Sequence, residues 1–197
     1  MRPVPWWAVL SSAAAPVALI GGWTVAAGRQ TSPFNSVRDT ISALAAHGAT
    51  DRWIMTTGLA GLGVCHVVTA AGLRPAALPG RVVLAIGGLA TIAVAAFPQP
   101  VTGSSAAHFR AAAVGFTTLA GWTALAWRRE RPAPVALHLP VDLAAAAGLF
   151  AALGWFVYEL SSDGGAIGLS ERVVAGSQAL WPLVVVLSAR RSAANRD

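Results

Sequence analysis

The chain has 197 residues, of which 55% are hydrophobic and 11% are charged, with a formal net charge of +6 at pH 7. A water-soluble domain normally carries about 25% charged residues, so this composition excludes an ordinary soluble domain and indicates an integral membrane protein. The fourteen basic residues are all Arg. They lie at the ends of apolar runs, where membrane orientation explains them, so the positive charge does not indicate nucleic-acid binding.

Six apolar runs approach the roughly 20 residues that a helix needs to cross a bilayer. We therefore predict one all-α, polytopic integral membrane domain over residues 1–197, with six transmembrane helices. The first run is interpreted as a retained span, because it is longer than the apolar part of a signal peptide and more spans follow. The predicted spans cover about residues 6–27, 53–73, 81–97, 108–127, 139–160 and 172–189.

The distribution of Arg residues predicts the orientation in the membrane. With six spans, nine of the fourteen Arg residues fall on the side that holds both termini, which predicts that the N- and C-termini are cytoplasmic. We expect the protein in the cell (inner) membrane. The nine are Arg2, Arg74, Arg81, Arg128, Arg129, Arg131, Arg190, Arg191 and Arg196.

A polar stretch separates the first two predicted spans. Ser36 followed by Asp39 fits the start of a capping box, and apolar residues then recur at helical spacing until Gly48. We predict a short amphipathic helix here, lying over the extracytoplasmic mouth of the bundle with its apolar face down.

Three residues at this outer side are the candidate catalytic groups. Asp39 lies on the predicted short helix, Glu159 closes the fifth span, and His108 opens the fourth. A carboxyl group near the hydrocarbon boundary is costly to ionise and can serve as a proton donor. The structural alternatives are that Asp39 caps its helix and that Glu159 reaches the interface. His66, in the middle of the second span, is expected to face the bundle interior as an interhelical hydrogen bonder.

Aromatic residues near the same depth are candidates for substrate binding, because aromatic faces stabilise cations. The alternative is an interfacial belt. No HExxH, GxSxG or Walker motif is present, and we predict neither a metal nor a cofactor. The candidate substrate-binding residues are Trp23, Trp53, Trp122, Trp155, Phe156 and Tyr158.

Three stretches resemble the bacterial and archaeal membrane family catalogued as domain of unknown function 998. They are the D-x-I-S-x-L helix after the first span, the F-P loop followed by a span-opening His, and the G-L-x-E-R start of the last span. The family pattern often has an Asp shortly after F-P, where this chain has Gln99. The resemblance implies a six-helix architecture and no chemistry.

In size, composition and outer acidic and aromatic content, the chain is also similar to actinobacterial membrane-bound terpene cyclases. The expected function is therefore acid/base chemistry on a lipophilic, isoprenoid substrate in secondary metabolism, as in a proton-initiated cyclisation. The partners would be the lipid bilayer and a lipophilic small molecule. The alternatives are a non-catalytic protein that binds lipid or transports a small molecule, and a structural subunit that pairs with a partner helix.

Overall fold

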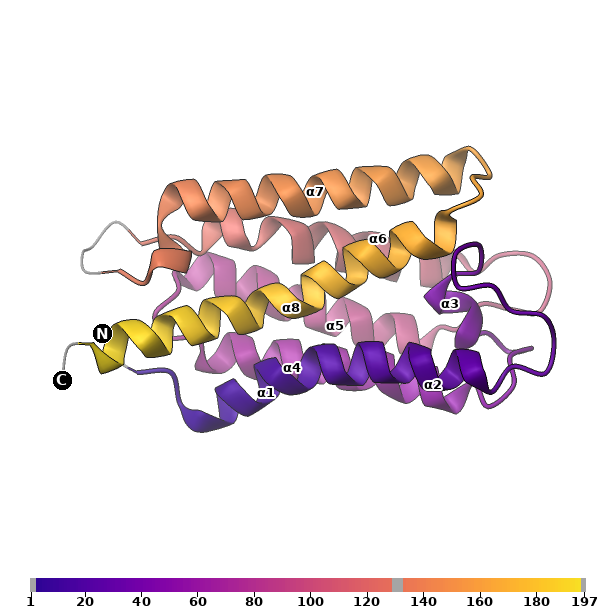
Figure 1. Ribbon diagram of the computed structural model, residues 1–197, viewed down its shortest axis with the longest axis horizontal. Helices are drawn as coiled ribbons and strands as arrows, with labels where there is room; N and C mark the ends of the chain where they lie inside the picture. Colours follow the sequence, from indigo (N-terminus) through magenta and orange to yellow (C-terminus); the bar gives the residue numbers. More distant parts are fainter. Residues whose placement is uncertain (1–2, 129–132, 196–197) are drawn as a thin grey trace.

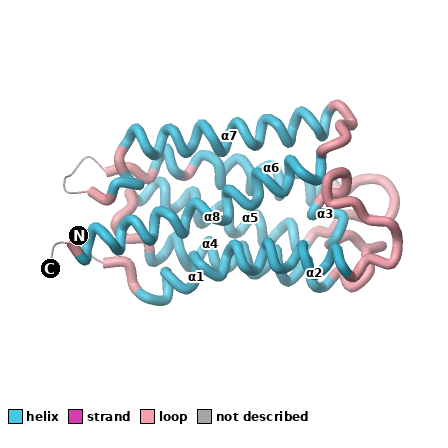
Figure 2. Tube along the Cα trace, viewed as in Figure 1, coloured by secondary structure: helices cyan, strands magenta, loops and turns pink. Residues whose placement is uncertain are grey.

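Helices are the only regular elements in the part of the chain that the structure, a computed structural model, describes: residues 3–128 and 133–195 (Figure 1, Figure 2). Arg2, Arg129, Arg131 and Arg196 lie outside these residues. The α-helices are α1 (Trp6–Pro16), α2 (Gly22–Gly28), α3 (Ile41–Leu44), α4 (Trp53–Gly72), α5 (Leu78–Ala96), α6 (Ala106–Gly121), α7 (Leu139–Ser161) and α8 (Ile167–Ala194). A π-helical turn, Val17–Gly21, joins α1 to α2, and 3-10 turns occupy Thr123–Leu125 and Val135–Leu137.

The long helices form a ring in chain order. α1 packs against α4, α4 against α5, α5 against α6, α6 against α7 and α7 against α8, and α8 closes the ring against α1. Figure 1 shows the two termini at one end of this elongated bundle and α3 at the other. We refer to them as the terminal end and the α3 end.

Five stretches of helix are long and apolar enough to cross a membrane, by length and composition alone, within the described residues: Trp6–Gly28, α4, α5, α7 and α8. The prediction of a multi-pass all-α protein is therefore supported, but its sixth span is not confirmed. The predicted span 108–127 corresponds to α6, which has only 16 residues and is followed by the 3-10 turn Thr123–Leu125.

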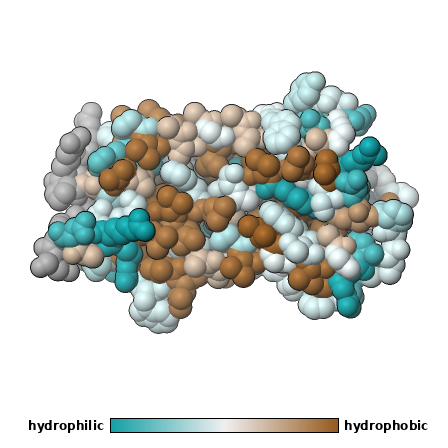
Figure 3. Space-filling view, in the orientation of Figure 1, coloured by the Kyte–Doolittle hydropathy of each residue, from teal (hydrophilic) through white to brown (hydrophobic). Residues whose placement is uncertain are grey.

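The outside of the bundle is apolar around its middle. Large hydrophobic side chains are exposed on every long helix, as a lipid-facing surface requires. Figure 3 shows hydrophobic residues over the centre of one face and hydrophilic residues gathered mainly at the two ends. Examples of the exposed residues are Leu10, Val64, Leu89, Val114, Phe150 and Val184.

The short helix between the first two spans exists, but it is shorter than predicted. It covers only Ile41–Leu44, and its N-cap is Thr40, whose hydroxyl accepts a hydrogen bond from the Ala43 N–H at 3.1 Å. The predicted cap, Ser36, lies instead in a turn that precedes the helix. The apolar face does point inward, because Ile41 and Leu44 are both buried.

Glycines set the spacing between α4 and α5. A Cβ atom on Gly63 would lie 2.5 Å from the Gly88 carbonyl oxygen, and one on Gly88 would lie 2.6 Å from the Gly63 carbonyl oxygen. Small residues allow helix backbones to approach this closely in a membrane bundle. The same contact brings the Cβ of His66 near Gly88 and so fixes the depth of this histidine.

Candidate functional site

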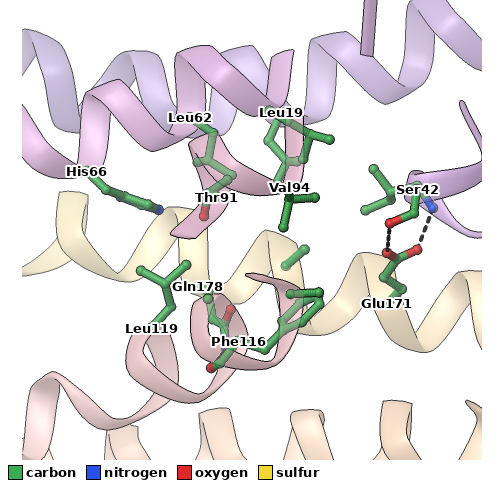
Figure 4. A pocket seen from close by; sticks show the side chains of 15 residues that line it. Leu19, Ser42, Leu62, His66, Thr91, Val94, Phe116, Leu119, Glu171 and Gln178 are labelled. Carbon is green, nitrogen blue, oxygen red and sulfur yellow. Dashed lines mark hydrogen bonds between the residues drawn. The ribbon is translucent and has the colours of Figure 1, made fainter. Parts of the chain in front are cut away.

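An internal cavity of about 60 Å³ runs along the bundle beneath α3. We call it the axial cavity. Its walls come from the π-helical turn and from α4, α5, α6 and α8, while Ile41 and Ser42 of α3 close its outer end. A single water needs about 10–15 Å³ of such cavity volume, so the axial cavity has room for several waters or for part of a hydrocarbon chain. Figure 4 shows the side chains that surround it.

A second cavity, of about 250 Å³, lies between α6 and α7, and we call it the lateral cleft. Phe109, Val157 and Leu160 line it and are also exposed on the outside of the bundle, so the cleft reaches the apolar outer surface. Ser42 and Glu171 line both cavities. The cleft lining is mainly apolar but also includes Thr40, Gln99, His108 and Thr117, so Ser42 and Glu171 are reached from the outer surface by a mainly apolar route.

Glu171, Ser42 and His108 form a hydrogen-bonded chain where the two cavities adjoin. The Ser42 Oγ lies 3.3 Å from the Glu171 Oε1 and 3.1 Å from the His108 Nε2. The other carboxyl oxygen of Glu171 accepts the Ile41 N–H, and the other ring nitrogen of His108 lies 2.9 Å from the Phe97 carbonyl oxygen. Glu171 and His108 are only 4% and 3% exposed. We call this chain the Glu–Ser–His relay.

The fixed partners of the relay restrict where its proton can reside. A carbonyl oxygen only accepts, so the His108 Nδ1 must donate to Phe97. If His108 is neutral, its Nε2 accepts from the Ser42 hydroxyl, and a protonated Glu171 donates to Ser42. If His108 is cationic, its Nε2 donates to Ser42, and Ser42 donates to the Glu171 carboxylate. The two arrangements hold the same number of protons, so a proton can move between Glu171 and His108 through Ser42.

Contacts of the Arg172 side chain dock α3 and the preceding turn onto α8. The Arg172 Nη1 donates to the carbonyl oxygens of Ser36, Asp39 and Gly168 at 2.8–2.9 Å. Its guanidinium also lies over the rings of Trp23 and Phe34, 5.9 and 5.8 Å from their centroids. These contacts bring Ser42 to Glu171.

Of the predicted catalytic residues, the structure brings only His108 to a cavity. The Asp39 side chain accepts the Asn35 N–H at 2.6 Å and so holds a turn together. Glu159 accepts the Trp155 Nε1–H at 3.2 Å and the Ala166 N–H at 3.0 Å, and so closes the loop between α7 and α8. Neither acid lines the axial cavity or the lateral cleft. Asp39 does not cap α3, whose N-cap is Thr40, so both acids stabilise local backbone turns.

The predicted aromatic residues are dispersed. Phe156 lines the lateral cleft and packs against Phe116 with the ring centroids 5.3 Å apart. Trp122 is fully buried in a separate core cluster toward the terminal end. Trp23 packs beside Arg172, and the remaining three are more than a third exposed on the bundle surface: Trp53, Trp155 and Tyr158. Phe116, which sequence reasoning did not select, lines both cavities.

Ser42 and Glu171 were also missed as site residues, although a signal for them was present. The three stretches of the family resemblance contain Ser42, the Phe97–His108 pair and Glu171, and the structure joins them in one relay. Their place in these stretches was the signal, and only the structure shows that they converge. No group of three or more His, Cys, Asp or Glu that could hold a metal ion occurs within the described residues.

Over the described residues, the fold and the cavities define an all-helical protein that has five helices long and apolar enough to cross a membrane and a buried polar site next to a cleft that opens on the apolar outer surface of the bundle. Residues 12–188 match the family described as Protein of unknown function (DUF998), and the chain belongs to this family. No curated protein and no solved structure matches the chain.

Proposed function

We propose that this protein is an integral membrane enzyme that performs acid/base chemistry on a lipophilic substrate. The observation that carries the proposal is the Glu–Ser–His relay, which adjoins two apolar cavities. Buried polar groups are costly unless they are hydrogen-bonded, and this relay satisfies its groups while keeping a transferable proton beside the cavities. A positioned acid or base of this kind contributes about 10²–10⁴-fold to a reaction rate.

The reaction we favour is the proton-initiated cyclisation of an isoprenoid. The Glu171 hydroxyl gives its proton to one alkene carbon, and the neighbouring carbon becomes a cation. The π electrons of a second alkene then form the ring bond, and loss of a proton to the Glu171 carboxylate completes the reaction. The product is an isomer of the substrate. Phe116 and Phe156, which pack together at the cleft, would stabilise the cation through their ring faces.

The proposed membrane arrangement has six spans. The 16 residues of α6 and the 3 residues of the following 3-10 turn rise together about 30 Å, which matches the hydrocarbon thickness. α6 also packs between α5 and α7 and exposes Val114 outward. With both termini in the cytoplasm of a cell-membrane protein, the relay lies at the extracytoplasmic end.

The second candidate function is lipid binding or transport without chemical change. The lateral cleft favours it, because a cleft lined by apolar side chains between α6 and α7 would accommodate a hydrocarbon chain whether or not a reaction follows. In that case the relay would recognise the polar end of the lipid.

Isotope incorporation distinguishes these candidates. Membranes that contain the protein are incubated in D₂O with a panel of polyprenyl alcohols and polyprenyl-substituted arenes, and the products are separated by mass spectrometry. Cyclisation yields an isomer that carries one deuterium from solvent. Glu171→Gln should abolish this product. Glu159→Gln is the matched control, because Glu159 lies near the same end of the bundle and lines neither cavity.

Loss of the deuterated isomer in the Glu171 variant alone supports the proposal. Equal activity in both variants would eliminate Glu171 as the acid. Binding of the panel without any isomer, or movement of an unchanged compound across sealed vesicles, would favour the second candidate.

A further inference from the structure

His66 lies in the wall of the axial cavity with its hydrogen-bonding capacity unused. Its side chain is fully buried, and neither ring nitrogen has a hydrogen-bond partner among the residues that the structure describes. Figure 4 shows the ring projecting from α4 into the cavity. Burying a polar group without a partner costs free energy, so the arrangement favours an occupant with polar groups that the described residues do not supply.

Besides Ser42 and Glu171, two further polar side chains line the same cavity. The Thr91 hydroxyl donates to the Gly87 carbonyl oxygen at 2.8 Å and the Gln178 amide nitrogen donates to the Phe116 carbonyl oxygen at 2.9 Å. Both bonds use donors, so the Thr91 Oγ1 and the Gln178 Oε1 keep lone pairs that can accept. The rest of the lining is mainly apolar, including Leu62 and Leu119.

We propose that His66 binds the single polar group of an uncharged lipophilic substrate, a hydroxyl or a carbonyl. A neutral imidazole offers one N–H donor and one acceptor nitrogen, and a hydroxyl group complements both. The inference rests on the proposed function in taking the axial cavity as the substrate site. It does not depend on the reaction itself.

The charges around the cavities select against an anionic headgroup. None of the described residues that line the axial cavity or the lateral cleft is an Arg. Arg172, the cation adjacent to Glu171 in the sequence, lines neither cavity; its Nη1 donates to three backbone carbonyl oxygens, and its Nη2 is buried without a partner among the described residues. A phosphate or diphosphate placed in either cavity would therefore lack a lining cation, and burying it would be costly.

The bundle geometry also fixes where the reacting carbon must lie. The axial cavity extends along α8 from Glu171 to Gln178 and along α4 from Leu59 to His66. Seven residues of helix rise about 10 Å. The cavity therefore extends at least about 10 Å along each helix, and a substrate whose polar group is bound at His66 presents to Glu171 a carbon farther along its chain. This makes His66 the residue that sets the position of reaction along the chain.

Binding to the full-length protein in lipid nanodiscs tests this assignment. The probes are farnesol, the corresponding hydrocarbon and farnesyl phosphate, and each is compared between variants so that partitioning into lipid cancels. In the wild type we expect farnesol to bind about tenfold more tightly than the hydrocarbon, and the phosphate to bind more weakly than farnesol. His66→Phe should remove the advantage of farnesol, and His66→Gln should retain part of it.

The matched control is His47→Phe, because His47 is exposed and lines neither cavity. As an independent measurement, the ring ¹⁵N resonances of His66 in the wild type should shift with farnesol and not with the hydrocarbon. His66→Phe should also raise the thermal midpoint, because it removes an unpartnered polar group.

Persistence of the farnesol preference in His66→Phe would overturn the assignment, as would the absence of any preference in the wild type. These outcomes leave the proposed acid chemistry unaffected, since deuterium incorporation measures it separately. Conversely, a farnesol preference without turnover of any substrate would support the assignment of His66 and contradict the proposed acid chemistry.

Discussion

Two glutamates near the α3 end show how differently one residue type is used within a few turns of chain. Glu159, at the end of α7, contacts Trp155 and Ala166, both within seven residues of it. Glu171, in α8, contacts Ile41 and Ser42, which are 130 and 129 residues away. The first contacts close a loop and the second join separate parts of the fold beside a cavity. Long-range packing therefore decides which acid lies beside a cavity.

The most direct test of the Glu–Ser–His relay is a substitution of Ser42. In Ser42→Ala the proton path between Glu171 and His108 is lost, while both partners stay in place. We expect the rate of solvent-deuterium incorporation to fall by about a hundredfold, the lower part of the range for acid/base groups. The measurement is the initial rate of formation of the deuterated isomer in D₂O.

Ser42→Thr provides the matched control, because it keeps the hydroxyl group and should restore most of the rate. A Ser42→Ala protein with wild-type rate would show that Glu171 is reprotonated by another path. Retained folding is checked by the unchanged thermal midpoint of the variant in detergent.

Much of the fold was predictable because membrane helices leave a strong local signal. Apolar runs of about 20 residues located all the long helices to within a few residues at most ends, since hydrocarbon thickness sets their length. One exception was the fourth span, where α6 ends at Gly121 and not at the predicted residue 127. The last span was the other. Its helix begins at Ile167, before the predicted residue 172. The reason is that α8 extends beyond the apolar run to meet the turn that carries Asp39.

The site was less predictable, because its contacts span most of the chain. His108 was selected from its place at the start of a span, a local signal. Glu171 stands in the G-L-x-E-R stretch of the family resemblance, but nothing in the sequence pairs it with Ser42, and Glu159 attracted notice instead because it has three aromatic neighbours. Only the packing of α3 against α8 shows that Ser42 reaches Glu171. The buried position of His66 was predicted from the face of the helix on which it lies. The sequence could not predict that its ring would have no hydrogen-bond partner among the described residues.

The docking of the turn onto α8 gives the next test, at Gly168. A Cβ atom there would lie 2.8 Å from the Ser36 carbonyl oxygen, so Gly168→Ala must displace the turn that leads into α3. Overpacking of this kind costs about 1–3 kcal/mol in the free energy of unfolding. SDS-induced unfolding of the purified protein measures the loss.

Gly154→Ala is the matched control, because a Cβ atom at Gly154 would meet nothing within 4 Å. The control should be neutral or slightly stabilising, as Ala favours helix more than Gly does. Equal effects of the two substitutions would mean that the turn does not depend on close contact with α8. The activity of Gly168→Ala should fall as well, since a displaced α3 moves Ser42 away from Glu171.

The smallest effect is expected at Glu159. In Glu159→Gln the amide keeps one acceptor oxygen for two donors, the Trp155 Nε1–H and the Ala166 N–H, so one hydrogen bond is lost. A typical intramolecular hydrogen bond contributes about 0.5–1.5 kcal/mol net, and partial exposure places this loss at the lower end. Trp155→Phe removes one of the same bonds, so the double variant should lose less than the sum of the two single losses. Additive losses of unfolding free energy in SDS would contradict the shared hydrogen bond. A loss of turnover in Glu159→Gln would mean that Glu159, and not Glu171, is the catalytic acid.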